Sequence, residues 1–222
     1  MNFDNQISHI DFIKNLNKEK LINGEAFSYS LANENFGCLE YVIENNYSQP
    51  PSVKNLISNV ILTFTDENEI CKCIDFLYSK NFEGDNLSYK YAIEKGYLKV
   101  VKSLIKNGCS LSEDCCGYAG LFGNLEILKH LHEKGCPWDY KTYSNILTWS
   151  GKNSKEEEKI NKFNCLTYAY SNNCPVENNS NSINQLKYDI YKKRTPIDYI
   201  DFLKDNNLYS EKEEKEFNEK KN

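Results

Sequence analysis

Apolar residues recur along this chain in a fixed pattern. The segment Tyr97–Cys109 matches the segment Asn124–Cys136 at a shift of 27 residues. With the cysteine that ends each segment as the reference position, further units align on Tyr47, Phe82, Cys174 and Leu208. The positions eleven, nine, eight and five places before the reference are apolar in all six units. These spacings place the four positions on one face of a short helix and are not those of a strand.

A second column explains how each of these helices ends. The residue before the reference position is always glycine or asparagine: Asn46, Asn81, Gly108, Gly135, Asn173 and Asn207. These two residue types most readily adopt the left-handed conformation that terminates a helix. Upstream, the segments Ala92–Gly96 and Ala119–Gly123 are typical of the end of an earlier helix, with a small residue where two helices meet. Each unit is therefore predicted to be a helix-turn-helix hairpin.

The same alignment predicts how the chain is divided. Residues 1–24 are predicted to be an N-terminal capping half-repeat, because Ile10–Ile13 repeats Ile74–Leu77. About six repeats are predicted over 25–209, with irregular insertions near 49–60, 151–160 and 177–184, followed by a charged tail over 210–222. The charged stretch 152–159 is expected to protrude and take no part in the core, so that its deletion changes stability by less than about 1 kcal/mol.

The stretch Gly123–Asp139, with its Gly-Cys-Pro-Trp-Asp ending, resembles ankyrin repeats of the short variety. The resemblance implies an all-α fold, an ankyrin-like α-solenoid of stacked helix-turn-helix repeats, which binds other proteins and has no catalytic activity of its own. The chain departs from the common pattern, because it has no Thr-Pro-Leu-His opening and its 27-residue unit leaves little room for a protruding β-hairpin.

Composition narrows the classes of function. The chain is 40% hydrophobic and 13% aromatic, enough to build a core, and its net charge of -5 argues against a nucleic-acid binder. We find neither a membrane-spanning stretch nor a signal peptide, and none of the nine cysteines lies in a C-x-x-C motif. We therefore expect a cytoplasmic, monomeric protein whose cysteines are reduced core residues.

Candidate chemistry is sparse. His130, His132 and Cys136 suggest a metal site, but residues two apart on a helix point to nearly opposite sides. His132 and Cys136 correspond to Ile105 and Cys109 one unit earlier, so the repeat itself accounts for these two positions. We expect no catalytic residue, metal or cofactor. A metal-binding or enzymatic helical-repeat protein, or a degenerate repeat-family member without a partner, remains as an alternative.

The connecting segments between units supply the candidate binding residues. If the stack follows ankyrin geometry, equivalent connections lie side by side along one edge. This candidate partner-binding edge is acidic and rich in tyrosine, which suits another protein that carries a basic segment. Trp138 is interpreted as a packing residue, whereas Trp149 has no counterpart in the other units and is assigned to the surface. The edge comprises Asp85, Tyr89, Asp114, Tyr118, Asp139, Tyr140, Tyr143 and Trp149.

Overall fold

The computed structural model describes residues 3–15, 24–47, 55–146, 148, 156–175 and 204–205. All regular secondary structure within these ranges is helical, which confirms the all-α prediction. The chain forms two compact units, Met1–Ser110 (unit 1) and Leu111–Asn222 (unit 2).

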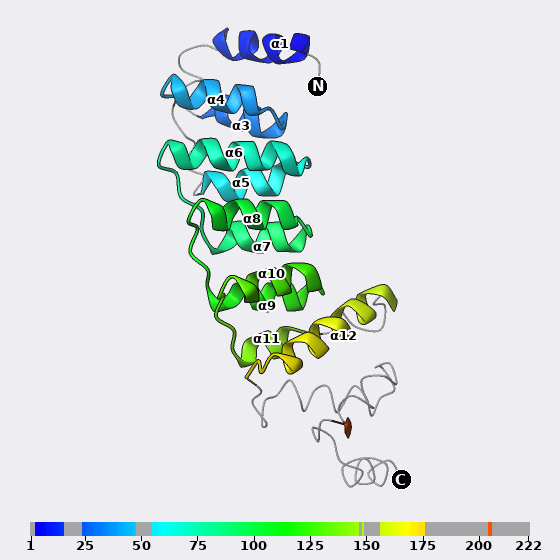
Figure 1. Cartoon of the computed structure of the whole chain (residues 1–222). Coiled ribbons are helices and arrows are strands. Elements are labelled where there is room, and N and C mark those ends of the chain that lie inside the picture. The colour runs from blue at the N-terminus through cyan, green and yellow to red at the C-terminus, as the bar shows by residue number, and fades with distance from the viewer. Residues whose placement is uncertain are drawn as a thin grey trace. The chain divides into compact units, whose positions relative to one another are not determined.

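Unit 1 is built from helical hairpins arranged in two layers (Figure 1). One layer holds the first helix of each hairpin, α3, α5 and α7, and the other holds the second helices, α4, α6 and α8, with α1 packed beside α4. The bounds are α1 Phe3–Lys14, α3 Glu25–Ala32, α4 Phe36–Glu44, α5 Leu56–Thr63, α6 Glu67–Ser79, α7 Asn86–Glu94 and α8 Leu98–Lys106. Ile13 of α1, which the sequence aligns with Leu77, is fully buried.

The described residues of unit 2 form two hairpins. Helix α9 pairs with α10 and α11 pairs with α12, while α9 packs on α11 and α10 on α12. The bounds are α9 Glu113–Leu121, α10 Leu125–Glu133, α11 Tyr140–Ile146 and α12 Glu156–Ser171.

The apolar columns of the sequence form the core of both units. All described members of the columns nine, eight and five places before the reference position are buried. The described members of the column eleven places before it are half-buried. The buried members are Cys38, Leu39, Val42, Cys73, Ile74, Leu77, Val100, Val101, Leu104, Ile127, Leu128, Leu131, Cys165, Leu166 and Ala169. Because these residues come from every described second helix, one short pattern specifies the interior of each hairpin.

The glycine and asparagine column terminates the second helices as predicted. Its described members have positive φ, for example 84° at Gly108 and 64° at Asn81. After α8, the Gly108 N–H donates to the carbonyl of Ile105 and the Cys109 N–H donates to the carbonyl of Leu104. This pair of bonds is the Schellman motif, which satisfies carbonyls that a helix end would otherwise leave without partners.

The same motif ends most of the first helices. Gly96 after α7 and Gly123 after α9 have positive φ, in agreement with the helix ends that the sequence predicts there. After α3 the left-handed residue is Glu34, whose carboxylate accepts the N–H and the hydroxyl of Thr65 at the end of α5. Those two bonds connect neighbouring hairpins and help to hold a residue type that rarely adopts this conformation.

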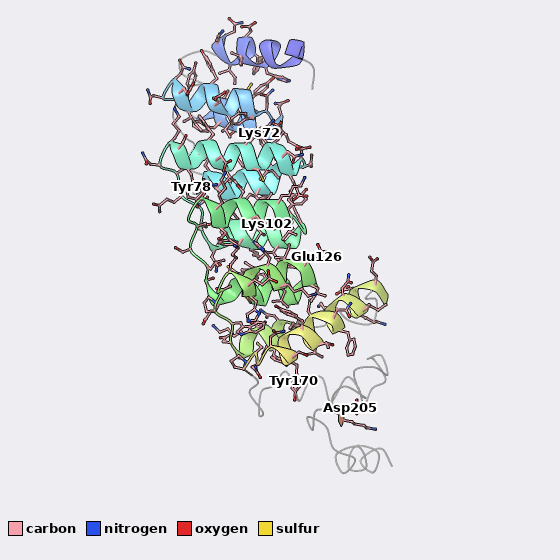
Figure 2. All side chains as sticks on the ribbon, viewed as in Figure 1. Lys72, Tyr78, Lys102, Glu126, Tyr170 and Asp205 are labelled. Atoms are coloured by element: carbon pink, nitrogen blue, oxygen red, sulfur yellow. The ribbon has the colours of Figure 1, made fainter. Side chains whose placement is uncertain are left out.

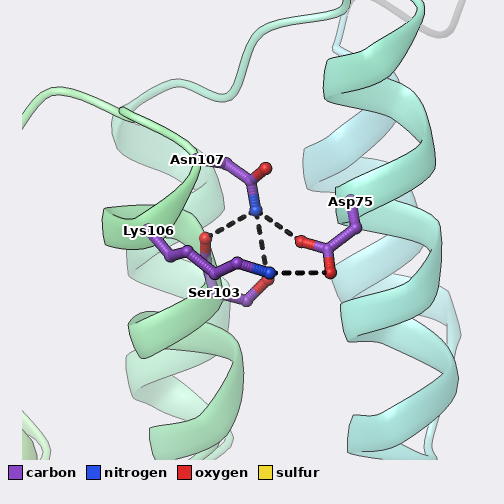
Figure 3. Close-up of polar contacts among 4 residues, drawn as sticks. All are labelled: Asp75, Ser103, Lys106 and Asn107. Carbon is purple, nitrogen blue, oxygen red and sulfur yellow. Dashed lines mark hydrogen bonds and ion pairs between the residues drawn. The ribbon is translucent and has the colours of Figure 1, made fainter.

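Polar contacts also connect the second helices of unit 1. Asp75 on α6 accepts hydrogen bonds from the Asn107 amide at 2.6 Å and from the Lys106 ammonium at 3.2 Å (Figure 3). The same Asn107 amide donates to the Ser103 carbonyl, so it bridges the end of α8 and the side of α6. The Asn107 hydrogen bond and the neighbouring Lys106 together lower the pKa of Asp75.

Two of the predicted insertions differ from the structure. Residues 56–60, placed within the insertion near 49–60, belong to helix α5, in which Leu56, Ile57 and Val60 are buried. Residues 156–159 begin helix α12, and the Glu158 carboxylate lies 3.7 Å from the buried Lys162 ammonium. That part of the charged stretch therefore contacts the interior of unit 2 and does not simply protrude.

The remaining predictions about domain organisation concern other parts of the chain. The insertion near 177–184, the last of the six repeats and the tail over 210–222 lie outside the described residues, apart from residues 204–205.

Candidate interaction surface

Two residues of the predicted partner-binding edge lie in unit 1, and their positions correct that prediction. Tyr89 is completely buried, and its hydroxyl donates to the Cys109 carbonyl at 2.8 Å. Asp85 is the N-cap of α7, where its carboxylate accepts the Ser88 N–H and the Ser58 hydroxyl. Tyr89 is therefore a core residue, and Asp85 stabilises the start of a helix.

In unit 2 the edge is also only partly exposed. Tyr143 is 4% exposed, and this burial raises the pKa of its hydroxyl. The Asp139 carboxylate accepts the Lys141 N–H at the start of α11, which is again a local structural role. Asp114 and Tyr118 lie half-buried on the outer side of α9, so these two remain candidates for contact.

The other two predicted edge residues are not described at the level of side chains. The backbone of Tyr140 begins α11, but its side chain lies outside the described residues, as does Trp149.

A tyrosine recurs at an equivalent sequence position in several first helices. In three of these helices a half-buried tyrosine directly precedes a fully buried small residue: Tyr29–Ser30 in α3, Tyr91–Ala92 in α7 and Tyr118–Ala119 in α9. Tyr29 packs against α1, where its ring stacks on Phe12 with centroids 4.5 Å apart and its hydroxyl lies 2.6 Å from His9 Nδ1. Tyr91 and Tyr118 have no such ring contact among the described residues and lie half-buried on their helices. The edge prediction includes only Tyr118, although a tyrosine before the small-residue column is a repeating signal that the sequence contains.

In unit 1 Tyr91 lies on a surface that also carries exposed leucines. Leu62 on α5 is 47% exposed and Leu87 on α7 is 46% exposed. We call the outward side of α3, α5 and α7 the first-helix face. It consists of Glu25, Ser28, Ala32, Asn59, Leu62, Thr63, Leu87, Lys90, Tyr91 and Glu94.

The opposite layer of unit 1 has a different chemical character. Its exposed side chains are mostly charged, as Lys72 on α6 and Lys102 on α8 illustrate (Figure 2). Ion pairs cross between its helices, with the Lys80 ammonium 3.2 Å from the Glu44 carboxylate and Lys106 equally close to Asp75. Such a surface is well solvated and already satisfies its own charges, so the first-helix face is the better candidate for a protein contact.

Unit 2 carries a smaller aromatic cluster between α10 and α12. The Trp138 and His132 rings stack with centroids 3.9 Å apart, and His132 Nδ1 lies 2.9 Å from the Tyr168 hydroxyl. Lys129 places its ammonium 5.7 Å from the centre of the Tyr168 ring. Trp138 therefore packs within its own unit, in agreement with its interpretation as a packing residue.

The cysteines show the features of core residues. All nine have free thiols, and all except Cys71 are buried. Burial raises the pKa of Cys38 to about 11 and that of Cys165 to about 12, so these thiols stay protonated and unreactive at neutral pH.

No cluster of three or more histidine, cysteine or acidic side chains in the described ranges could hold a metal ion. None of the described helices is long and apolar enough to cross a bilayer.

Comparisons of this chain with protein family models, with curated proteins and with solved structures gave no match.

Proposed function

We propose that this protein is a non-catalytic protein–protein interaction module, an ankyrin-like α-solenoid that binds a partner through its first-helix face. The observation that carries the proposal is the contrast between the two layers of unit 1. The exposed side chains of one layer include Leu62 and Leu87, whereas those of the other layer are mostly charged and include two ion pairs that join its helices. The Gly-Cys-Pro-Trp-Asp ending at 135–139 and the helical hairpins of both units support the repeat class.

The chemistry of the first-helix face suits a protein partner. Tyrosine is enriched at protein interfaces because it adds a large apolar area and a polar hydroxyl at a small cost in conformational entropy. Only Glu25, Lys90 and Glu94 carry charge on this face. Burying it against a partner therefore removes apolar area from water at the centre and leaves charges at the rim, the arrangement typical of stable interfaces.

The proposal is tested by comparing the proteins that wild type and surface variants of the two layers capture. Tagged wild type, Leu87→Glu and Tyr91→Ala are compared with Lys102→Glu, a matched control that places glutamate on the exposed side of the opposite layer. All three altered residues are exposed or half-buried, so circular dichroism should show unchanged helix content. Proteins bound by wild type and by Lys102→Glu, but lost with both first-helix variants, are the expected partners.

Purified complexes then provide a quantitative result. Titration calorimetry with a captured protein should show that Tyr91→Ala weakens binding about tenfold or more, the loss expected of an aromatic anchor. If the two first-helix variants bind the same proteins as wild type, with the same affinity, this face is not the binding site.

A further inference from the structure

A polar groove lies on unit 1 between two consecutive connections. It occupies about 320 Å³ between the loop after α6 and the loop after α8. Its lining includes Tyr78, Asn81, Glu83, Asn107 and Ser110, and Tyr78 stands at the loop end of α6 (Figure 2). The shape of the groove depends on close packing, because a Cβ atom at Gly84 would lie 3.0 Å from both the Tyr78 hydroxyl oxygen and Cys109 Sγ.

The electrostatics of this groove favour a positive charge. Glu83 is the one charged residue in the lining of the groove, and it is exposed at the rim. Helices α6 and α8 both end at the groove, and a helix C-terminus carries about half a negative elementary charge. A carboxylate and two helix ends of the same sign therefore act on one polar cavity.

The nearby lysines are directed to other groups. The Lys80 ammonium lies 3.2 Å from the Glu44 carboxylate and 5.3 Å from the centre of the Phe76 ring. The Lys106 ammonium is held by Asp75, also at 3.2 Å. Neither lysine lines the groove, so neither neutralises it.

The Tyr78 hydroxyl completes the site. Its oxygen accepts the Gly84 N–H at 3.1 Å, which fixes the ring against the loop. Burial raises the pKa of Tyr78 to about 12, and the hydroxyl is therefore neutral at physiological pH. The groove thus combines one carboxylate with neutral hydroxyl, amide and backbone groups, a set that matches the several N–H donors of an extended cationic side chain.

We propose that this groove binds an arginine side chain from a basic segment of a partner protein. The guanidinium would lie between Glu83 and the two helix ends, where its charge is stabilised and its donors meet polar acceptors. This site is separate from the first-helix face and does not depend on it. A Tyr91→Ala protein that has lost its partner should still bind a short arginine peptide.

The probe is an acetylated and amidated Ala-Ala-Arg-Ala-Ala peptide, titrated into the full-length ¹⁵N-labelled protein and followed by NMR. The neutral isostere, in which citrulline replaces arginine, is titrated in parallel. We expect saturable shifts of the amide signals of Gly84, Gly108 and Ser110 with the arginine peptide and none with the citrulline peptide. Glu83→Gln should weaken binding at least threefold, whereas the control Glu126→Gln, at an exposed glutamate of α10 outside the groove and the first-helix face, should leave it unchanged.

Three results would overturn the inference. Equal shifts with the citrulline peptide would show that charge is not recognised. Equal losses for Glu83→Gln and Glu126→Gln would show a general attraction to an acidic protein and no defined site. The absence of shifts at the three groove amides at millimolar peptide would exclude binding there.

Discussion

Replacement of Gly108 by alanine distinguishes a left-handed helix end from an ordinary helical position. Gly108 follows α8 at a φ of 84°, and its N–H and that of Cys109 form the two bonds of the Schellman motif. A Cβ atom added at Gly108 would meet no atom within 4 Å. The substitution therefore changes the backbone preference without creating a steric clash.

The sign of the change in the free energy of unfolding distinguishes a left-handed from a right-handed helical conformation at this glycine. In a left-handed conformation, alanine costs roughly 1–2 kcal/mol because its Cβ crowds the following carbonyl oxygen. In the interior of a right-handed helix, the same change stabilises by about 1 kcal/mol. We expect Gly108→Ala to lower the free energy of unfolding by roughly 1–2 kcal/mol.

Urea denaturation followed by circular dichroism measures this change, with the slope of the transition checked against wild type. Gly135→Ala is a replicate in unit 2, because Gly135 has a φ of 77° and also has open space around its Cβ position. If either variant is as stable as wild type or more stable, the glycine column does not end helices as described.

Two further predictions concern the core. Leu104→Ala should cost about 2–5 kcal/mol, because Leu104 is fully buried and leaves a cavity, whereas Ile105→Ala, next to it but half-buried, should cost clearly less in the same urea assay. Stability should also fall as pH rises from about 9 towards 12, since burial raises the pKa of Cys165 from 9.0 to about 12 and that of Cys38 to about 11. A thiol whose pKa is raised by folding contributes its full stability below its pKa in the unfolded state. That contribution is lost as the pH rises through its pKa in the folded state. The pKa of the buried Lys162 is lowered, so this single group acts in the opposite sense to the thiols named above. Constant or rising stability over this pH range would contradict the burial of the thiols.

The sequence predicted the second helices well because two independent signals coincide there. The apolar columns give the buried side of each helix, and a glycine or asparagine such as Gly108 or Asn81 gives its end. Both signals follow from local backbone and side-chain chemistry, which a single sequence displays directly.

The first helices were harder to predict because their signals are weaker. Helix α5 begins at Leu56, only a few residues after Pro50 and Pro51. Two consecutive prolines are typical of a loop. The edge prediction assigned Tyr89 to a connecting segment, but α7 begins at Asn86, and a shift of a few residues along a helix decides whether a side chain faces the core. Candidate surface residues therefore depended on helix bounds that the pattern alone did not determine.

Hydrogen–deuterium exchange of a purified complex tests the central claim most directly. The partner should be a protein that wild type binds and the Tyr91→Ala variant does not. The account predicts slower exchange on binding in peptides that cover α3, α5 and α7, with the second helices α4, α6 and α8 unchanged. Protection confined to the second helices, with α5 and α7 exchanging as in the free protein, would contradict a partner-binding role for the first-helix face.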